Sequence, residues 1–149
     1  SASEMTLEDL RNTMTINFEG AVSVRKAVQQ HLTDDARIVV VGSQLGTRGS
    51  PHGADYSASK AALAIWARSL AQEVGPEGKR VNVLAPGYVD TAILAGDSEE
   101  KRKFRENEVP LKRVGSPEDM ASTISFLAGQ DSSYITGAII HVNGGLYLP

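Results

Sequence analysis

The 149-residue sequence contains no cysteine, so disulfide bonds and thiolate metal sites are excluded. This absence agrees with a reducing compartment, and we expect a cytoplasmic protein. No apolar run approaches the ~20 residues that a membrane-spanning helix needs. The first residues also lack the charged-then-apolar pattern of a secretory signal peptide. We therefore expect no membrane partner.

The sequence also lacks a large excess of charge of one sign, because 15 basic and 18 acidic side chains leave a net charge of only −3. A nucleic-acid-binding surface requires a basic patch, so nucleic acid is not an expected partner. The sequence is 41% hydrophobic and 22% charged, which is the balance of a globular protein. Its length predicts a single domain over residues 1–149.

Helical patterns cover much of the chain. Apolar residues recur every three or four positions over residues 7–32, and Thr6 is the expected N-cap with Asp9 in a capping box. A second helix is predicted over residues 55–74. The charged run 99–108 predicts a solvated helix, and Ser116 before Pro117 predicts the start of a helix that runs to about residue 128.

Three short runs rich in β-branched residues predict buried strands at residues 37–43, 80–85 and 138–142. Strands that alternate with helices predict an α/β fold with a parallel sheet and right-handed crossovers. Ligands bind such sheets beyond the carboxyl ends of the strands. Ser43 and Pro86-Gly87 both lie at such ends, so we expect them on one rim of the sheet.

Tyr56 and Lys60 lie four residues apart near the start of the second predicted helix, so their side chains share a face. A phenol is ordinarily too weak an acid to exchange protons at neutral pH, with a pKa near ~10. A cation within ~4–6 Å, together with the positive end of a helix, favours the phenolate. The pair is thus a candidate proton donor and acceptor. Its simpler interpretation is a surface tyrosine and lysine at helical spacing.

Two further residues add to this pair. Ser43 ends a strand 13 residues before Tyr56, where its hydroxyl can hydrogen-bond a substrate carbonyl, although a strand-end serine often only caps a turn. Asn17 is a poor interior helix residue, and with Gly20 close behind it predicts a kink or an inserted water. The alternative is an exposed asparagine on an amphipathic helix.

In this order and spacing the four residues resemble the catalytic tetrad of the short-chain dehydrogenase/reductase superfamily. Five surrounding motifs extend the resemblance over nearly the whole chain: Asn-Phe-Glu-Gly, Gly-Ser-Gln-Leu-Gly, Val-Asn-Val-Leu-Ala-Pro-Gly-Tyr-Val-Asp-Thr, Pro-Leu-Lys-Arg-Val-Gly-Ser-Pro-Glu-Asp and Ile-Thr-Gly-Ala followed by Asn-Gly-Gly. The resemblance implies a partial Rossmann-like, doubly wound sheet that comprises the three C-terminal strands of that fold with flanking helices.

The resemblance also implies roles for the tetrad. Tyr56 is the expected general acid/base, and Lys60 is expected to assist it, to bind the nicotinamide ribose and to feed a proton relay. Ser43 is expected to orient the substrate carbonyl, and Asn17 to hold a relay water.

The expected cofactor is NAD or NADP. Besides Tyr56 and Lys60, the residues expected to contact it are Pro86, Gly87, Val89 and Thr91. The expected substrate is a small carbonyl or alcohol compound, and no metal site is expected. A lid-like insert is predicted over residues 91–115.

The glycine-rich strand–turn–helix that binds the dinucleotide in this family has no counterpart here. We therefore expect a fragment that does not bind NAD(P) alone and that acts as a homo-oligomer or with a complementing segment. The first strand is then expected to expose an apolar edge.

Two function classes follow. One is an NAD(P)-dependent oxidoreductase that interconverts a secondary alcohol and a ketone when complete, and the other is an inactive fragment that serves as an assembly element. A hydrolase using Ser43 is a third reading, but His31, His52 and His141 have no evident orienting acid.

Overall fold

The computed structural model describes residues 1–92 and 94–149. Its strands form one parallel sheet in the order β1 (Arg37–Val41), β2 (Arg80–Pro86) and β3 (Ile139–Val142). Arg37 lies opposite Arg80, and Val83 lies opposite Ile139. The predicted strands and the predicted α/β class are confirmed, but of the three strands predicted to be buried only β2 is, while β1 and β3 are half-buried.

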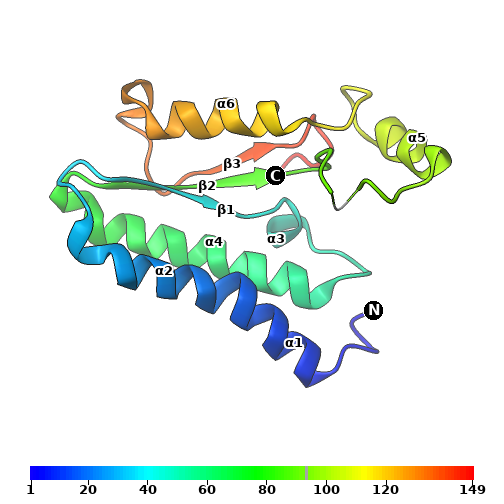
Figure 1. The fold of residues 1–149 in the computed structure, drawn as a ribbon, viewed down its shortest axis with the longest axis horizontal. Coiled ribbons are helices and arrows are strands. Elements are labelled where there is room, and N and C mark those ends of the chain that lie inside the picture. The colour runs from blue at the N-terminus through cyan, green and yellow to red at the C-terminus, as the bar shows by residue number, and fades with distance from the viewer. Residues whose placement is uncertain (93) are drawn as a thin grey trace.

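Helices cover both faces of the sheet and its carboxyl end (Figure 1). They are α1 (Leu7–Met14), α2 (Gly20–Val28), α3 (Leu45–Arg48), α4 (Ala54–Val74), α5 (Glu99–Glu108) and α6 (Pro117–Ala128), with short 3-10 turns at Gln29–His31, Gly75–Glu77 and Gln130–Ser132. In Figure 1, α1, α2 and α4 lie on one face and α6 on the other, while α3 and α5 lie toward the carboxyl ends of the strands. No helix of the described residues is both long and apolar enough to cross a lipid bilayer.

The first predicted helix is interrupted. Its start is confirmed, because Thr6 and Asp9 form a capping box in which each side chain accepts a hydrogen bond from the other's backbone N–H. Between α1 and α2, however, Thr15–Glu19 form a π-helical turn that contains Asn17. Such turns insert one residue into the helix and are frequent at functional sites. The irregularity predicted at Asn17 is therefore a π-turn.

The crossovers differ from the prediction that both are right-handed. The strands follow one another across the sheet in the order β1-β2-β3, yet α4 connects β1 to β2 on one face and α6 lies between β2 and β3 on the other (Figure 1). Two successive crossovers in the same direction on opposite faces have opposite hands, so only one is right-handed. The strong preference for right-handed crossovers gives way here because each face of the sheet needs a covering helix.

The core lies between α4 and the sheet. Small residues of α4 bring its backbone close to β2, and their partners on the strand are fully buried. The core residues are Ala64, Ala67, Leu70, Ala71, Val74, Val81 and Val83, with Ile38, Val40, Trp66 and Ile139 packed against them. This packing fixes α4, and with it Tyr56 and Lys60, relative to the strand ends.

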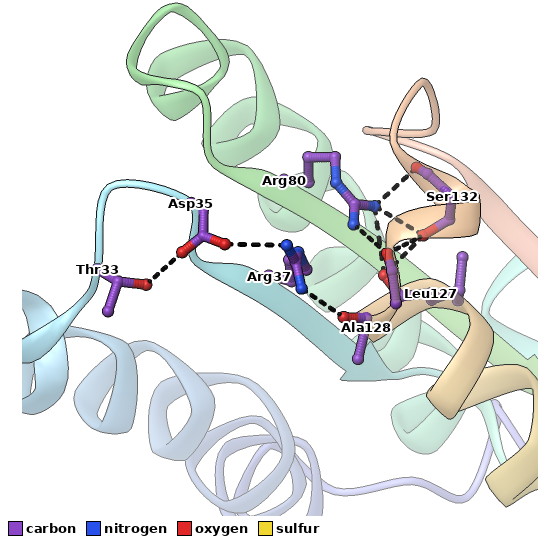
Figure 2. Close-up of polar contacts among 8 residues, drawn as sticks. Thr33, Asp35, Arg37, Arg80, Leu127, Ala128 and Ser132 are labelled. Carbon is purple, nitrogen blue, oxygen red and sulfur yellow. Dashed lines mark hydrogen bonds and ion pairs between the residues drawn. The ribbon is translucent and has the colours of Figure 1, made fainter.

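The amino end of the sheet is held to α6 by arginine. Arg80 is only 9% exposed and donates to the carbonyls of Leu127 (3.2 Å) and Ser132 (2.8 Å) (Figure 2). It also donates to the carbonyls of Gly129 and Ile135. These carbonyls lie at or just beyond the negative end of α6, which compensates the buried cation without a carboxylate. On the next strand, Arg37 donates to the carbonyl of Ala128 at 3.1 Å.

Candidate functional site

The segments that follow the three strands meet at one rim, as the parallel pattern predicts. The N–H of Gln44, after β1, donates to the carbonyl of Pro86 at the end of β2 (3.0 Å). The N–H of Gly87 in turn donates to the carbonyl of Val142 at the end of β3 (3.1 Å). The rim is thus a continuous hydrogen-bonded edge that carries Ser43 and the Pro86-Gly87 turn.

A buried amide pair locks this rim. Asn143 Nδ2 donates to Gln44 Oε1 (3.1 Å) and to the carbonyl of Tyr147 (2.7 Å), and Asn143 Oδ1 accepts from the N–H of Gly145 (3.0 Å). Gln44 is 3% exposed and Asn143 9% exposed. A Cβ on Gly87 would lie 2.8 Å from Asn143 Cβ, so glycine is required there. Asn143 therefore touches the segments after both other strands.

The loop that carries Ser43 packs directly on the backbone of α4. A Cβ on Gly46 would lie 2.8 Å from the carbonyl carbon of Lys60 and 2.9 Å from the nitrogen of Ala61. Real Cβ atoms do not approach backbone so closely, so glycine permits the contact. Residues 45–48 of this loop form the short helix α3. Half-buried Ser43 accepts a hydrogen bond from the N–H of Leu45 at 3.2 Å.

Tyr56 and Lys60 lie in the first two turns of α4 on the same side, as their spacing predicts. Lys60 Nζ is 5.7 Å from the centroid of the Tyr56 ring and donates to the carbonyl of Val41 at 3.1 Å. Burial lowers the pKa of the Lys60 ammonium, because a charged amine loses hydration there. Tyr56 is 37% exposed, which leaves its side chain accessible to a substrate.

Asn17 reaches this pair through a residue that the sequence did not single out. Asn17 Nδ2 donates to Ser59 Oγ (3.1 Å), and Ser59 Oγ donates to the carbonyl of Tyr56 (2.8 Å). Ser59 is fully buried. Nearby, Thr13 Oγ1 donates to Asp55 Oδ2 at 2.8 Å, and this bond lowers the pKa of the Asp55 carboxyl. Two side-chain bonds thus fix the start of α4 against the first helix.

The residues expected to contact the cofactor follow β2 in order. Pro86 ends the strand, and Gly87 is half-buried beside Asn143. Val89 forms an isolated parallel bridge with Gly115, while Thr91 is exposed. The structure therefore places Pro86, Gly87 and Val89 along the rim and Thr91 at the entrance to the predicted insert.

Ion pairs stabilise the predicted insert. Asp97, whose side chain is 9% exposed, pairs with Lys101 (2.6 Å) and Arg105 (2.7 Å). Arg105 stacks 4.6 Å over the ring of Tyr88, whose hydroxyl donates to Glu108 at 3.0 Å. The predicted helix is confirmed as α5. Of the predicted insert 91–115, Ile93 is outside the described residues.

The histidines do not form the relay that a serine hydrolase needs. His141 packs edge-on against Tyr147, with ring centroids 5.5 Å apart. Its Nδ1 is buried and has no hydrogen-bond partner within residues 1–92 and 94–149. The Ser43 hydroxyl bonds to the backbone of Leu45 instead. Nothing in this geometry supports the hydrolase reading.

Comparison with known sequences identifies the family. The family described as enoyl-(acyl carrier protein) reductase matches residues 1–147. A 3-oxoacyl-(acyl-carrier-protein) reductase of Aquifex aeolicus is 40% identical over 149 residues, which cover 96% of this chain and 58% of that protein. The enzyme of the same name from Escherichia coli is 36% identical over 143 residues, covering 95% of this chain and 59% of that protein.

Comparison with solved structures supports the same family. A short-chain dehydrogenase/reductase from Brucella melitensis superposes with a TM-score of 0.92 at 34% identity, over 99% of this chain and 60% of that one. A blue fluorescent protein from a metagenomic library, in complex with NADPH, superposes with a TM-score of 0.89 at 36% identity. The match covers 98% of this chain and 59% of that one. The chain belongs to the short-chain dehydrogenase/reductase family. It spans about three-fifths of the length of the relatives that it matches.

Proposed function

We propose that this chain is the catalytic portion of an NAD(P)-dependent oxidoreductase that interconverts a ketone and a secondary alcohol. The observation that carries the proposal is the placement of Tyr56 and Lys60 on one side of α4, directly beside the loop that holds Ser43. The named activity of the Aquifex aeolicus and Escherichia coli relatives, reduction of a 3-oxoacyl group, supports a ketone substrate.

The proton chemistry belongs to the tetrad. The Tyr56 hydroxyl donates its proton to the carbonyl oxygen as negative charge develops there, and takes it back in the reverse direction. The cation of Lys60, near the ring, stabilises the phenolate that remains. Ser43 Oγ hydrogen-bonds the same carbonyl oxygen and orients it. Asn17 holds the start of α4 through Ser59, and its π-turn is where a relay water is expected.

The described residues fit one end of a nicotinamide dinucleotide. Lys60 offers ammonium donors to ribose hydroxyls, and Tyr56 lies next to it. Pro86, Gly87, Val89 and Thr91 form the segment along which the nicotinamide would lie, at the carboxyl end of β2. A reduced nicotinamide supplies a hydride to the carbonyl carbon when it is bound. The NADPH in the metagenomic relative supports this choice of cofactor.

Three finer points complete the proposal. The 149-residue chain alone does not bind NADH or NADPH tightly, because the described residues supply only the nicotinamide end. The working protein is a homo-oligomer or a complex with a complementing segment, in the cytoplasm. The segment after β2, with α5, closes over the substrate as a lid.

A reductase assay tests the proposal. The chain is assayed alone and in a chimera that joins it to the part of the Aquifex aeolicus reductase that it does not match. We expect NADPH oxidation with a 3-oxoacyl thioester by the chimera and none by the chain alone. A folded chimera that binds NADPH but reduces no ketone would contradict the proposal, and would leave the assembly role as the better reading.

A further inference from the structure

The segment that follows Ser43 carries an arginine to the rim of the sheet. Arg48 is the last residue of α3, the single helical turn at the carboxyl end of the sheet beside the start of α4 (Figure 1). Its N–H donates to the carbonyl of Gln44 at 2.8 Å, and the Gln44 side chain is bonded to Asn143. The backbone of Arg48 is therefore fixed, while its side chain is exposed.

The guanidinium of Arg48 is unpaired. Within residues 1–92 and 94–149, its side chain makes no hydrogen bond and no ion pair. By contrast, every lysine and arginine of residues 99–113 has a partner. These pairs are Lys101 and Arg105 with Asp97, Arg102 with Asp90, Lys103 with Glu99, Arg113 with Asp119, and Lys112 with the carbonyl of Asn107. In the described part of the chain, Arg48 is thus free to bind an anion.

Tyr88, on the segment after β2, lies near this guanidinium. Burial raises the pKa of the Tyr88 phenol, and its hydrogen bond to Glu108 raises it further. The cations of Arg105 and Arg48 lower the same pKa. Charges act on a pKa only over short distances, so Arg48 lies close to Tyr88. Two segments that follow strand ends therefore meet beside one unpaired cation, on the same rim as Ser43.

We infer that Arg48 binds an anionic group of the substrate, so that the preferred ketones are small oxo acids or oxo phosphates. The inference names the substrate class of the candidate site, and it rests on the proposed function of Ser43 and Tyr56. A guanidinium binds a carboxylate or a phosphate through two parallel hydrogen bonds, which makes it a specific anchor for either group.

The length of α3 limits the size of the substrate. This helix rises only about 6 Å from Gln44 to Arg48, since an α-helix rises ~1.5 Å per residue. A ketone whose oxygen is bonded to Ser43 therefore reaches Arg48 with an anion that is a few bonds from the carbonyl carbon. Because the backbone of Arg48 is already fixed, ordering its side chain is the main entropic cost of this contact.

Pairs of ketones that differ in an anionic group test the inference. In the chimera with the unmatched part of the Aquifex aeolicus reductase, kcat/KM is measured for 4-oxopentanoate and its methyl ester, and for hydroxyacetone phosphate and hydroxyacetone. We expect a preference for the charged member of one pair, and Arg48→Gln should lower this preference by about 10- to 100-fold, the worth of a hydrogen bond to a charged group. The pair affected identifies the anion as a carboxylate or a phosphate.

Arg68→Gln is the matched control. It removes an exposed cation that donates to the carbonyl of Gly137, just before β3 and away from the rim. This variant should keep the preference for the charged ketone. An unchanged preference in Arg48→Gln would overturn the inference, and so would equal losses in the two variants, because they would reflect only the net charge of the protein.

A binding measurement separates this inference from the proposed function. Calorimetric titration of 4-oxopentanoate or hydroxyacetone phosphate into the Tyr56→Phe chimera with NADPH gives Kd without turnover. Adding Arg48→Gln should raise the Kd of one of these anions by about 10- to 100-fold. A chimera that reduces ketones but shows no such rise would refute the inference alone. A chimera that shows the rise but, with Tyr56 restored, reduces no ketone would refute the proposed function and leave the anion site standing.

Discussion

Replacing Asn143 with aspartate removes both Nδ2 donors while keeping the shape of the side chain. The lost bonds are those to Gln44 Oε1 and to the Tyr147 carbonyl. Each contributes about 0.5–1.5 kcal/mol net, and leaving buried acceptors unpaired costs a further ~1–3 kcal/mol. We therefore expect Asn143→Asp to lower the free energy of unfolding by roughly 2–6 kcal/mol at pH 7.

The same variant has a predictable pH dependence. The introduced carboxyl faces two acceptor oxygens in a buried site, so its pKa in the folded state is raised above the ordinary ~3.9. Below pH ~3.9 the carboxyl is protonated in both the folded and the unfolded state, so its ionisation does not change the free energy of unfolding. Above that pH the unfolded state ionises more readily, and the folded state is increasingly destabilised relative to it. The loss of stability relative to the parent chain should therefore be smaller at pH 4 than at pH 7.

Urea unfolding at the two pH values measures this difference. The matched control is Asn12→Asp, the same chemical change at an exposed position of α1, which should stay within ~0.5 kcal/mol of the parent at both pH values. A loss at Asn143 that is the same at pH 4 and pH 7 would refute the reasoning, because it would show that the new carboxyl does not face the Gln44 and Tyr147 oxygens.

Further predictions concern the supports of the site. Arg80→Ala removes the charged donor of four carbonyls near the end of α6, each of which keeps one other hydrogen bond. Because hydrogen bonds from a buried cation are among the stronger ones, the variant should cost about 3 kcal/mol or more in urea unfolding, against less than ~1 for Arg37→Ala, and similar losses for the two would contradict the role of Arg80. Gly46→Ala pushes the Ser43 loop off α4 and should lower the free energy of unfolding by about 1–3 kcal/mol. Gly96→Ala, which has open space around it, should be nearly neutral. Calorimetry that finds both variants neutral would disprove the contact. Burial lowers the pKa of Lys60 in the folded state. At pH values between that pKa and the ordinary ~10.4, the unfolded chain therefore binds more protons than the folded one. Unfolding free energy should rise with pH through this window, and a Lys60→Met variant with the same rise would contradict it.

Local patterns in the sequence predicted the elements well. The strands, α4, α5 and α6 follow from β-branched runs, apolar periodicity and caps such as Ser116, whose capping box with Asp119 is present. Asn17 and Gly20 signalled an irregular helix, but helix propensity does not distinguish a π-turn from a kink. The prediction that both crossovers are right-handed was wrong for one of them, because the strand sequences are apolar on both faces and do not indicate which face α6 covers.

Long-range polar contacts were beyond sequence reasoning. Gln44 and Asn143 are 99 positions apart, and neither type of residue signals a buried partner. Ser59 lies directly before Lys60, but its bond to Asn17 depends on how the π-turn at Thr15–Glu19 packs against α4. The Tyr56–Lys60 pair was predictable because helical geometry fixes it locally. The bond from Lys60 to Val41 was not, since it requires the position of β1.

The central claim is that Tyr56 transfers the proton in ketone reduction, and one substitution tests it most directly. In the chimera with the unmatched part of the Aquifex aeolicus reductase, Tyr56→Phe removes only the hydroxyl. We predict that kcat for ketone reduction falls by about 10²–10⁴-fold while NADPH still binds. Tyr134→Phe, at a fully exposed tyrosine, should leave kcat unchanged. A Tyr56→Phe chimera that binds NADPH and keeps its kcat would contradict the account.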